Sequence, residues 1–123
     1  MINVLLVDDN ALVRKAIKTI LENHPAIQVI GECQDGEEVI PFVQCQQPDV
    51  ILMDNSMPVL NGIKATKLVR HLFPEIKVIG LSCDDDEVTK NAFLENGAVG
   101  FLSKYETTNE KLVLKINTCC LMV

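Results

Sequence analysis

Short runs of Val, Ile, Leu and Met alternate along the chain with longer segments in which apolar residues recur at helical spacing. The short runs predict five β-strands, at Asn3–Val7, Ile27–Cys33, Val50–Met53, Lys77–Leu81 and Val99–Ser103. These strands are almost continuously apolar, as parallel strands are when helices cover both faces of their sheet. The pattern therefore predicts an α/β fold with a parallel sheet.

Caps and turn residues mark the helices between the strands. Asn10 can cap a first helix that Pro25 closes, and Asp35-Gly36 turns the chain into a second helix over Glu37–Gln46. In the first helix the apolar side is Leu12, Val13, Ala16, Ile17, Ile20 and Leu21, and the other side carries Arg14, Lys15, Lys18 and Glu22. Further helices are expected from Asn61-Gly62 to Phe73-Pro74, from the acidic stretch Asp84–Glu87 to Asn96-Gly97, and over Asn109–Cys120.

Strands that alternate with helices through right-handed crossovers give a doubly wound three-layer α/β/α sandwich around a five-stranded parallel sheet. No internal repeat, low-complexity tract or linker interrupts the alternation. A length of 123 residues with 48% hydrophobic content is enough for one core, so we expect a single domain over residues 1–123.

The charge and the hydropathy argue against several classes of function. A net charge of −6 does not fit a nucleic-acid-binding face, which needs a basic surface. The first residues lack a basic stretch followed by a long apolar one, and no run approaches the roughly 20 apolar residues of a membrane helix. We therefore expect a cytoplasmic domain that contacts neither a membrane nor nucleic acid directly.

Five cysteines are scattered along the chain without a CxxC spacing, which argues against a disulfide framework and against a zinc site. Cys33, Cys45 and Cys83 are expected to act as small apolar residues in the interior. Cys119 and Cys120 are adjacent in the last predicted helix, and no function is assigned to them.

Polar residues follow four of the predicted strands at the point where each one stops: Asp8 and Asp9, Asp54, Ser82, and Lys104. Because the carboxyl ends of parallel strands share one edge of a sheet, these side chains are expected to gather where such folds bind ligands. Carboxylate oxygens suit Mg²⁺, and a carboxylate such as Asp54 can attack phosphorus to form an aspartyl phosphate. Lys104 and the metal would neutralise charge in that transfer, and Ser82 can donate a hydrogen bond to a phosphoryl oxygen.

Taken singly, each of these residues has a simpler explanation. An Asp after a strand usually caps a helix or forms a turn, a Lys in a loop is usually solvated, and a Ser is a common turn residue. The expectation of a phosphoryl-transfer site therefore rests on all of them falling at the same edge of the sheet.

A more specific pattern lies in several stretches: Leu5-Leu6-Val7-Asp8-Asp9-Asn10, Asp35-Gly36-Glu37-Glu38, Pro48–Asp54, Met57-Pro58 with Gly62, Ser82, and Gly100-Phe101-Leu102-Ser103-Lys104. With them the chain resembles the receiver domains of two-component response regulators over nearly its whole length. The resemblance implies a flavodoxin-like sheet of order 2-1-3-4-5. It also implies that a sensor histidine kinase or a phosphotransfer protein donates a phosphoryl group to Asp54, with Mg²⁺ as the cofactor, in a signalling domain that is not a turnover enzyme.

Residue by residue, the resemblance implies that Asp9, Asp54 and the backbone carbonyl of Ser56 bind the metal directly and that Asp8 reaches it through water. Ser82 corresponds to a switch hydroxyl, Phe101 to a switch aromatic and Lys104 to a phosphate-binding lysine. Movement of Ser82 toward the phosphoryl group and of Phe101 inward would change the surface of the fourth helix, the fifth strand and the last helix. Ser56 and Asp84 match positions that tune the phosphate lifetime.

In this family a proline normally follows the lysine, whereas Tyr105 follows Lys104 here, so the geometry of that loop is left open. The missing proline, together with Ala11–Lys15, Ile30–Glu32 and Gly62–Thr66, most resembles the LuxR/NarL-type subgroup with helix-turn-helix output. We therefore expect no effector domain in this chain, control of transcription through a DNA-binding domain outside it, and scope for a homodimer.

Three other interpretations remain. A phosphatase with an aspartate nucleophile expects a second Asp two places after the first, where Asp8 is followed at that spacing by Asn10. A flavin-binding module needs a hydroxyl- or glycine-rich phosphate loop after the first strand, and Asp8-Asp9-Asn10 would repel a phosphate unless a cation intervened. A receiver-like domain that dimerises or docks without phosphorylation is the third, and full partner binding by a Lys104→Ala or Asp54→Asn variant would favour it.

Overall fold

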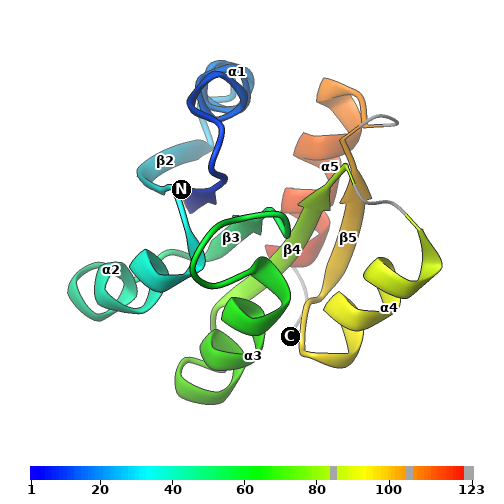
Figure 1. Ribbon diagram of the computed structural model, residues 1–123. Helices are drawn as coiled ribbons and strands as arrows, with labels where there is room; N and C mark the ends of the chain where they lie inside the picture. The colour runs from blue at the N-terminus through cyan, green and yellow to red at the C-terminus, as the bar shows by residue number, and fades with distance from the viewer. Residues whose placement is uncertain (84–85, 105–106, 121–123) are drawn as a thin grey trace.

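The computed structural model describes residues 1–83, 86–104 and 107–120 of the chain. Its strands are β1 (Ile2–Val7), β2 (Ile27–Cys33), β3 (Val50–Met53), β4 (Lys77–Ser82) and β5 (Gly100–Ser103). Its helices are α1 (Ala11–Glu22), α2 (Val39–Cys45), α3 (Gly62–Leu72), α4 (Glu87–Glu95) and α5 (Asn109–Cys120), with a 3₁₀ turn η1 at Gly36–Glu38. The predicted alternation of strands and helices is confirmed (Figure 1).

The five strands form one parallel sheet in the order β2-β1-β3-β4-β5, as the resemblance implied. Helices α1 and α5 pack on one face of the sheet, and α2, α3 and α4 pack on the other (Figure 1). The three-layer sandwich predicted from the sequence is therefore confirmed.

Alternate residues of the central strands supply two separate cores. Leu5 and Val7 of β1 belong to the core under α2, α3 and α4, whereas Val4 and Leu6 belong to the core under α1 and α5. Successive side chains of a strand point to opposite faces of its sheet. A strand with a core on each side must therefore be apolar at every position, which explains the unbroken runs in the sequence.

Side-chain caps begin three of the helices where the sequence placed them. The side chains of Asn10, Asn61 and Asp86 each accept hydrogen bonds from backbone N–H groups in the first turn of α1, α3 and α4. Gly97, just after the C-cap of α4, has φ 108°, the left-handed conformation that glycine adopts without strain. Asp84 and Asp85, which were expected to begin α4, lie outside the described residues, and the helix itself begins at Glu87.

The second helix differs from the predicted continuous span Glu37–Gln46. It starts as the 3₁₀ turn η1, because the Asp35 carboxylate accepts hydrogen bonds from the N–H groups of Glu37 and Glu38 at 2.9 and 3.1 Å. The α-helical part then begins at Val39, which places Pro41 in its first turn. A residue in a first turn needs no intrahelical acceptor for its N–H, so proline is tolerated there.

Several expectations about burial were wrong. Leu12 and Ala16 were assigned to the apolar side of α1 but are exposed. Leu12 is 78% exposed, since it lies in the first turn, before the helix packs onto the sheet. Cys45 and Cys83 are exposed, and only Cys33 of the three cysteines expected inside is buried. Cys45 ends α2 and Cys83 follows β4, so both lie at element ends rather than on core-facing positions.

Within the ranges that the structure describes, no helix has the length and apolar character needed to cross a membrane.

Candidate metal centre at the carboxyl edge of the sheet

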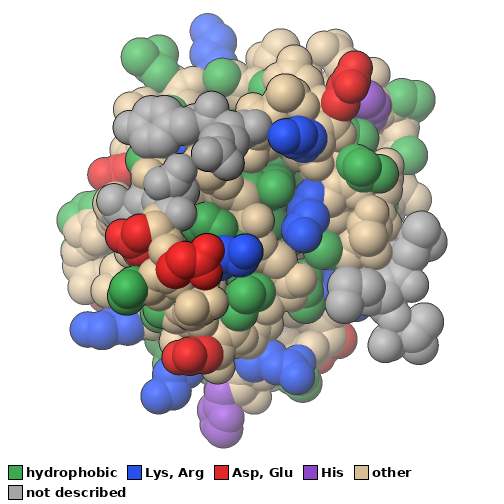
Figure 2. All heavy atoms as spheres, turned by 90° about the vertical axis from the view of Figure 1, so that its right-hand side faces the viewer, with side chains coloured by type: hydrophobic (Ala, Val, Ile, Leu, Met, Phe, Trp, Pro, Cys, Tyr) green, Lys and Arg blue, Asp and Glu red, His purple; other side chains and the backbone are tan. Residues whose placement is uncertain are grey.

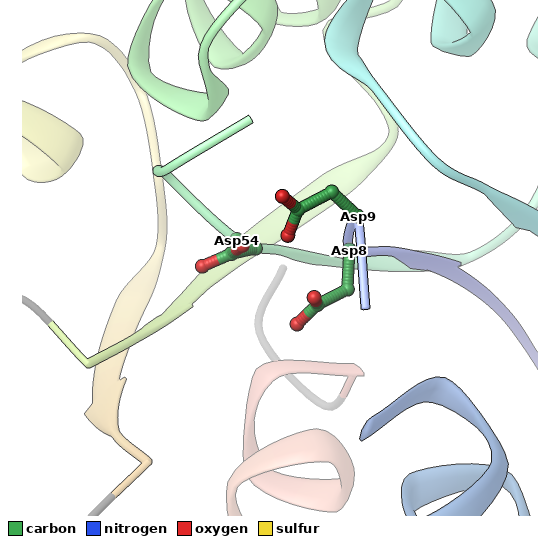
Figure 3. Close-up of side chains that lie close together, drawn as sticks. All are labelled: Asp8, Asp9 and Asp54. Carbon is green, nitrogen blue, oxygen red and sulfur yellow. The ribbon is translucent and has the colours of Figure 1, made fainter. Parts of the chain in front are cut away.

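Three carboxylates meet at the carboxyl edge of the sheet. Asp8 and Asp9 follow β1, and Asp54 follows the neighbouring strand β3, whose end is tied to β1 by a 2.9 Å hydrogen bond from the Asp54 N–H to the Val7 carbonyl. One carboxylate oxygen from each residue lies within 4.8 Å of the others (Figure 3). Asp8 is 4% and Asp54 5% exposed, whereas Asp9 faces solvent.

Lys104 brings a positive charge to this group from the same edge of the sheet, two strands away from β3. It follows β5, and its N–H donates a 3.0 Å hydrogen bond to the carbonyl of Ser82 at the end of β4. Its side chain reaches back across β4, donates a hydrogen bond to the Asp8 carboxylate, and lies 3.2 Å from Asp54 Oδ1. The predicted meeting of Asp8, Asp9, Asp54 and Lys104 is thus observed in the structure.

The burial of these groups perturbs their protonation. Burial raises the pKa of Asp54, the Lys104 ammonium opposes that shift, and the Asp8 charge adds to it, with the result above the ordinary value. Burial lowers the pKa of Lys104, but the hydrogen bond to Asp8 and the charge of Asp54 outweigh it and raise this pKa above its usual range. One ammonium facing three carboxylates leaves an excess of negative charge, so the oxygen donors fit a hard divalent cation such as Mg²⁺.

The two serines predicted for the site differ in burial. Ser82 is 1% exposed and ends β4, so it lies between the strand that carries Asp54 and the strand that carries Lys104. Ser56 is exposed in the loop that follows Asp54. Ser82 thus ends the strand beside the one that Asp54 follows, and Ser56 comes two residues after Asp54.

Gly62 controls how closely α3 approaches the Asp54 loop. Its N–H donates a 3.1 Å hydrogen bond to the Asn55 carbonyl, and a Cβ atom at this position would stand 1.8 Å from the backbone oxygen of Asp54. No side chain can be accommodated at that distance without moving the backbone. Glycine at this point therefore lets the helix start against the loop that carries the central carboxylate.

Phe101 lies on β5 beside Gly80 of β4 and is half-buried. Its ring centroid is 5.6 Å from that of the buried Phe93 of α4, at an interplanar angle of 43°. On the outer side it lines a pocket of about 290 Å³ that also involves α4 and the start of α5, and whose lining is Glu87, Lys90, Phe101, Leu102, Ser103, Thr107 and Lys111. Figure 2 looks onto this side of the molecule and shows lysine and arginine side chains near its middle.

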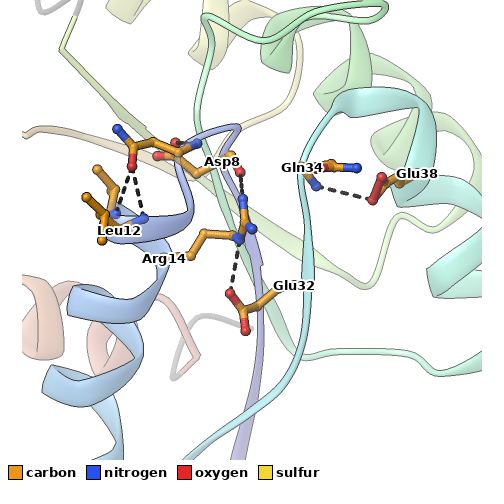
Figure 4. A network of polar contacts seen from close by, with 8 residues as sticks. Asp8, Leu12, Arg14, Glu32, Gln34 and Glu38 are labelled. Atoms are coloured by element: carbon orange, nitrogen blue, oxygen red, sulfur yellow. Dashed lines mark hydrogen bonds and ion pairs between the residues drawn. The ribbon is translucent and has the colours of Figure 1, made fainter.

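Sequence reasoning missed one polar network beside the carboxylates. Arg14 was expected on the solvent side of α1, but its side chain is only 15% exposed. It donates hydrogen bonds to the Asp8 backbone carbonyl and, over 3.0 Å, to the Glu32 carboxylate on β2 (Figure 4). The available signal was the opposite charge of Arg14 and Glu32 on elements that the fold makes neighbours. Tyr105 and Asp84, which the sequence had also singled out, lie outside the described residues.

Comparison with known proteins gives a consistent result. A family model described as the response regulator receiver domain matches residues 4–117. The transcriptional regulatory protein DegU of Brevibacillus brevis is 40% identical over 103 residues, which cover 84% of this chain and 44% of DegU. The chain therefore spans less than half the length of that relative.

Two solved structures have the same fold over nearly the full chain. The response regulator domain of Thermotoga maritima CheB has a TM-score of 0.91 at 34% identity and covers 100% of this chain and 98% of its own. The signal receiver domain of NarL from Mycobacterium tuberculosis has a TM-score of 0.91 at 28% identity, covering 97% of this chain and 95% of its own. Regulators of the LuxR/NarL type are thus among the similar proteins, as the sequence indicated.

Proposed function

The chain belongs to the response regulator receiver domain family of two-component systems, and on this premise we propose that Asp54 accepts a phosphoryl group from a histidine kinase or a phosphotransfer protein. The observation that carries the assignment to Asp54 is its position among the candidate groups. It is buried at the end of β3, one of its carboxylate oxygens lies within 4.8 Å of those of Asp8 and Asp9, and it lies 3.2 Å from the Lys104 ammonium.

The transfer forms one bond and breaks one. A carboxylate oxygen of Asp54 attacks the phosphorus, and the bond from phosphorus to the imidazole nitrogen of the donor histidine breaks as the new bond forms. The ammonium of Lys104 stands beside the attacking oxygen and offsets charge on the phosphoryl oxygens. The hydroxyl of Ser82, at the end of the intervening strand, donates a hydrogen bond to the phosphoryl group.

The metal-binding role rests on the donor chemistry of this edge. Asp9, Asp54 and the backbone carbonyl of Ser56 would hold Mg²⁺ directly, and Asp8 would hold it through a water molecule. Bound there, Mg²⁺ would supply the positive charge that three carboxylates and an incoming phosphoryl group require. The excess of carboxylates over ammonium groups at the site supports this part of the proposal.

The signal would leave the site through Ser82 and Phe101. A hydrogen bond from Ser82 to the phosphoryl group draws the end of β4 toward Asp54, and Phe101, which packs beside β4 at Gly80, then turns further inward. The 290 Å³ pocket lined by Phe101, α4 and the start of α5 changes shape with that ring. A partner that reads this surface would distinguish the two states.

We place this switch in a single receiver domain over residues 1–123 that works in the cytoplasm and does not turn over a separate substrate. Its output is transcription, through a DNA-binding domain outside these residues. The resemblance to DegU, whose name describes a transcriptional regulator and of which this chain covers 44%, supports that output.

A second candidate function is docking or homodimerisation that needs no phosphorylation. It is favoured by two apolar side chains on the helices beside the pocket, because Val88 of α4 is 80% exposed and Leu114 of α5 is 65% exposed. The Asp54→Asn variant separates the two functions, since it abolishes phosphorylation but leaves both side chains in place.

The test is the intact-protein mass after incubation with acetyl phosphate and Mg²⁺, followed by an acid quench. We expect wild type to gain the mass of one phosphoryl group, and Asp54→Asn or a sample containing EDTA to gain none. The exposed Asp49→Asn variant is the matched control and should be phosphorylated like wild type. Equal gains in wild type and Asp54→Asn would contradict the assignment. No gain in wild type, with a dimer that survives in Asp54→Asn, would favour the docking function.

A further inference from the structure

We propose that Arg14 is a positioning residue for the metal site: together with Glu32 it fixes the peptide bond between Asp8 and Asp9 and thereby sets how tightly this edge binds Mg²⁺. The inference rests on the proposed function of the site and adds to it a residue that, in the described structure, makes no hydrogen bond or ion pair to the three carboxylates. Figure 4 shows Arg14 reaching from α1 to Asp8 on one side and Glu32 on the other.

The peptide groups around Asp8 are held at several points. The Asp8 N–H donates a 3.0 Å hydrogen bond to the Cys33 carbonyl at the end of β2, which fixes the peptide before Asp8. The Asp8 carbonyl accepts a hydrogen bond from Arg14 Nη1, which fixes the peptide after it. The Asn10 N–H then donates to Asp8 Oδ1 over 2.9 Å. Among these three contacts, only the hydrogen bond from Arg14 is made to the Asp8–Asp9 peptide group itself.

This peptide plane governs where both aspartate side chains point. Rotation of the plane changes ψ of Asp8 and φ of Asp9, so it swings the exposed Asp9 carboxylate relative to the buried ones. Three carboxylates within 4.8 Å of one another repel, and the repulsion pushes the least buried of them outward. A clamp on the peptide opposes that movement and keeps the ligands close together before a cation arrives.

An arginine is needed for this clamp because the two acceptors lie in different directions. Nη1 donates to the Asp8 carbonyl while Nε donates to Glu32 Oε1 at 3.0 Å. The planar guanidinium holds these donors in a rigid fork, whereas a lysine ammonium is a single point on a flexible stem. Glu32 belongs to β2, so the fork also ties the loop after β1 to the edge strand of the sheet.

The experiment is a calorimetric titration of the protein with Mg²⁺ in the absence of any phosphoryl donor. For Arg14→Lys, which keeps the charge but loses the fork, we expect affinity for Mg²⁺ to fall about tenfold, at the low end of what groups that orient metal ligands contribute. Glu32→Ala is expected to weaken binding in the same direction, whereas Glu32→Gln, which keeps an acceptor for Nε, should bind nearly as wild type does. Arg70→Lys is the matched control, because Arg70 also donates to a backbone carbonyl, that of Pro74, but at the opposite edge of the sheet.

Thermal unfolding in EDTA separates positioning from a merely structural role. If Arg14 only stabilises the fold, Arg14→Lys lowers the unfolding temperature but binds Mg²⁺ with wild-type affinity at a temperature where both proteins are folded. That result overturns the proposal. If the charge of Arg14 matters rather than its geometry, Arg14→Met binds Mg²⁺ more tightly than wild type because a positive charge has been removed, and this too overturns it. Acetyl phosphate labelling of wild type tests the proposed function separately, so wild type that is labelled beside an Arg14→Lys variant with unchanged affinity refutes only the positioning role.

Discussion

Replacing Lys104 with methionine should destabilise the metal-free protein strongly at neutral pH and much less in mild acid. The substitution keeps a long, flexible apolar stem but removes the ammonium that contacts the carboxylates of Asp8 and Asp54. Both carboxylates are buried, at 4% and 5% exposure, so water cannot replace the lost charge. Removing one partner of a buried ion pair leaves an uncompensated charge, which is more costly than losing a surface pair.

The magnitude follows from the spacing of the charges. At a separation of 4.8 Å, two carboxylates repel by about 3.5 kcal/mol with an effective dielectric constant of about 20. The variant can avoid this repulsion by protonating one carboxyl. From an ordinary pKa of 3.8, that protonation costs about 4 kcal/mol at pH 7 but only about 1.6 kcal/mol at pH 5. We therefore expect a loss of about 3 kcal/mol in the free energy of unfolding at pH 7 and of about half that at pH 5.

Urea unfolding followed by circular dichroism, in EDTA at both pH values, measures these losses. The exposed Lys67→Met variant is the control and should stay within about 0.5 kcal/mol of wild type. A loss for Lys104→Met that is the same at pH 7 and pH 5, or that does not exceed the loss in the control, would refute the reasoning that Lys104 neutralises a buried carboxylate pair.

Three further outcomes follow from the same contacts. Gly62→Ala should lower the free energy of unfolding, measured by urea titration, by at least about 2 kcal/mol, because its Cβ would stand 1.8 Å from the backbone oxygen of Asp54. The same substitution should reduce the thermal shift caused by Mg²⁺. An unchanged urea midpoint would contradict this. The pKa of Asp54 is raised in the folded protein above its ordinary value of 3.8, so the folded state binds this proton more tightly than the unfolded state does. The resulting stabilisation is fully present below pH 3.8 and is lost as the pH rises through the folded-state pKa. Metal-free Asp54→Asn should therefore melt above wild type at pH 7 by calorimetry, with a difference that shrinks toward pH 4, and a lower melting temperature at pH 7 would count against it. Phe93→Ala should cost about 3–5 kcal/mol, since Phe93 is fully buried against Gly80 and Phe101, and a loss under about 1 kcal/mol by urea titration would be inconsistent with that packing.

The sequence predicted the layers of this fold because its central strands β1 and β3 are almost continuously apolar. The residues Val4, Leu5, Leu6 and Val7 belong alternately to the two cores, and that requirement produces an unbroken apolar run that can be recognised in the sequence. The start of the second helix was harder to predict, because the 3₁₀ turn at Gly36–Glu38 depends on hydrogen bonds to the side chain of Asp35 rather than on apolar spacing. The exposure of Leu12 could not be predicted from its spacing, since it depends on where along α1 the helix meets the sheet.

The same contrast applies to the site. Asp8, Asp9, Asp54 and Lys104 could be grouped in advance because each follows a strand and the strand order makes their ends neighbours. Arg14 could not be grouped with them, because the apolar pattern of α1 places it on the polar side of the helix, which was expected to face solvent. Its actual partners, the Asp8 carbonyl and Glu32, come from the loop after β1 and from β2, and only the packed structure brings those acceptors together.

The most direct test of the account is to locate the phosphoryl group itself. Wild-type protein treated with acetyl phosphate and Mg²⁺ is reduced with borohydride, which converts an aspartyl phosphate to homoserine, and the peptides are then sequenced by mass spectrometry. We predict homoserine at position 54, in wild type and not in a sample treated in EDTA. Homoserine at position 8 or 9 with an intact Asp54, or none in protein whose mass shows a phosphoryl group, would contradict the central claim that Asp54 is the acceptor.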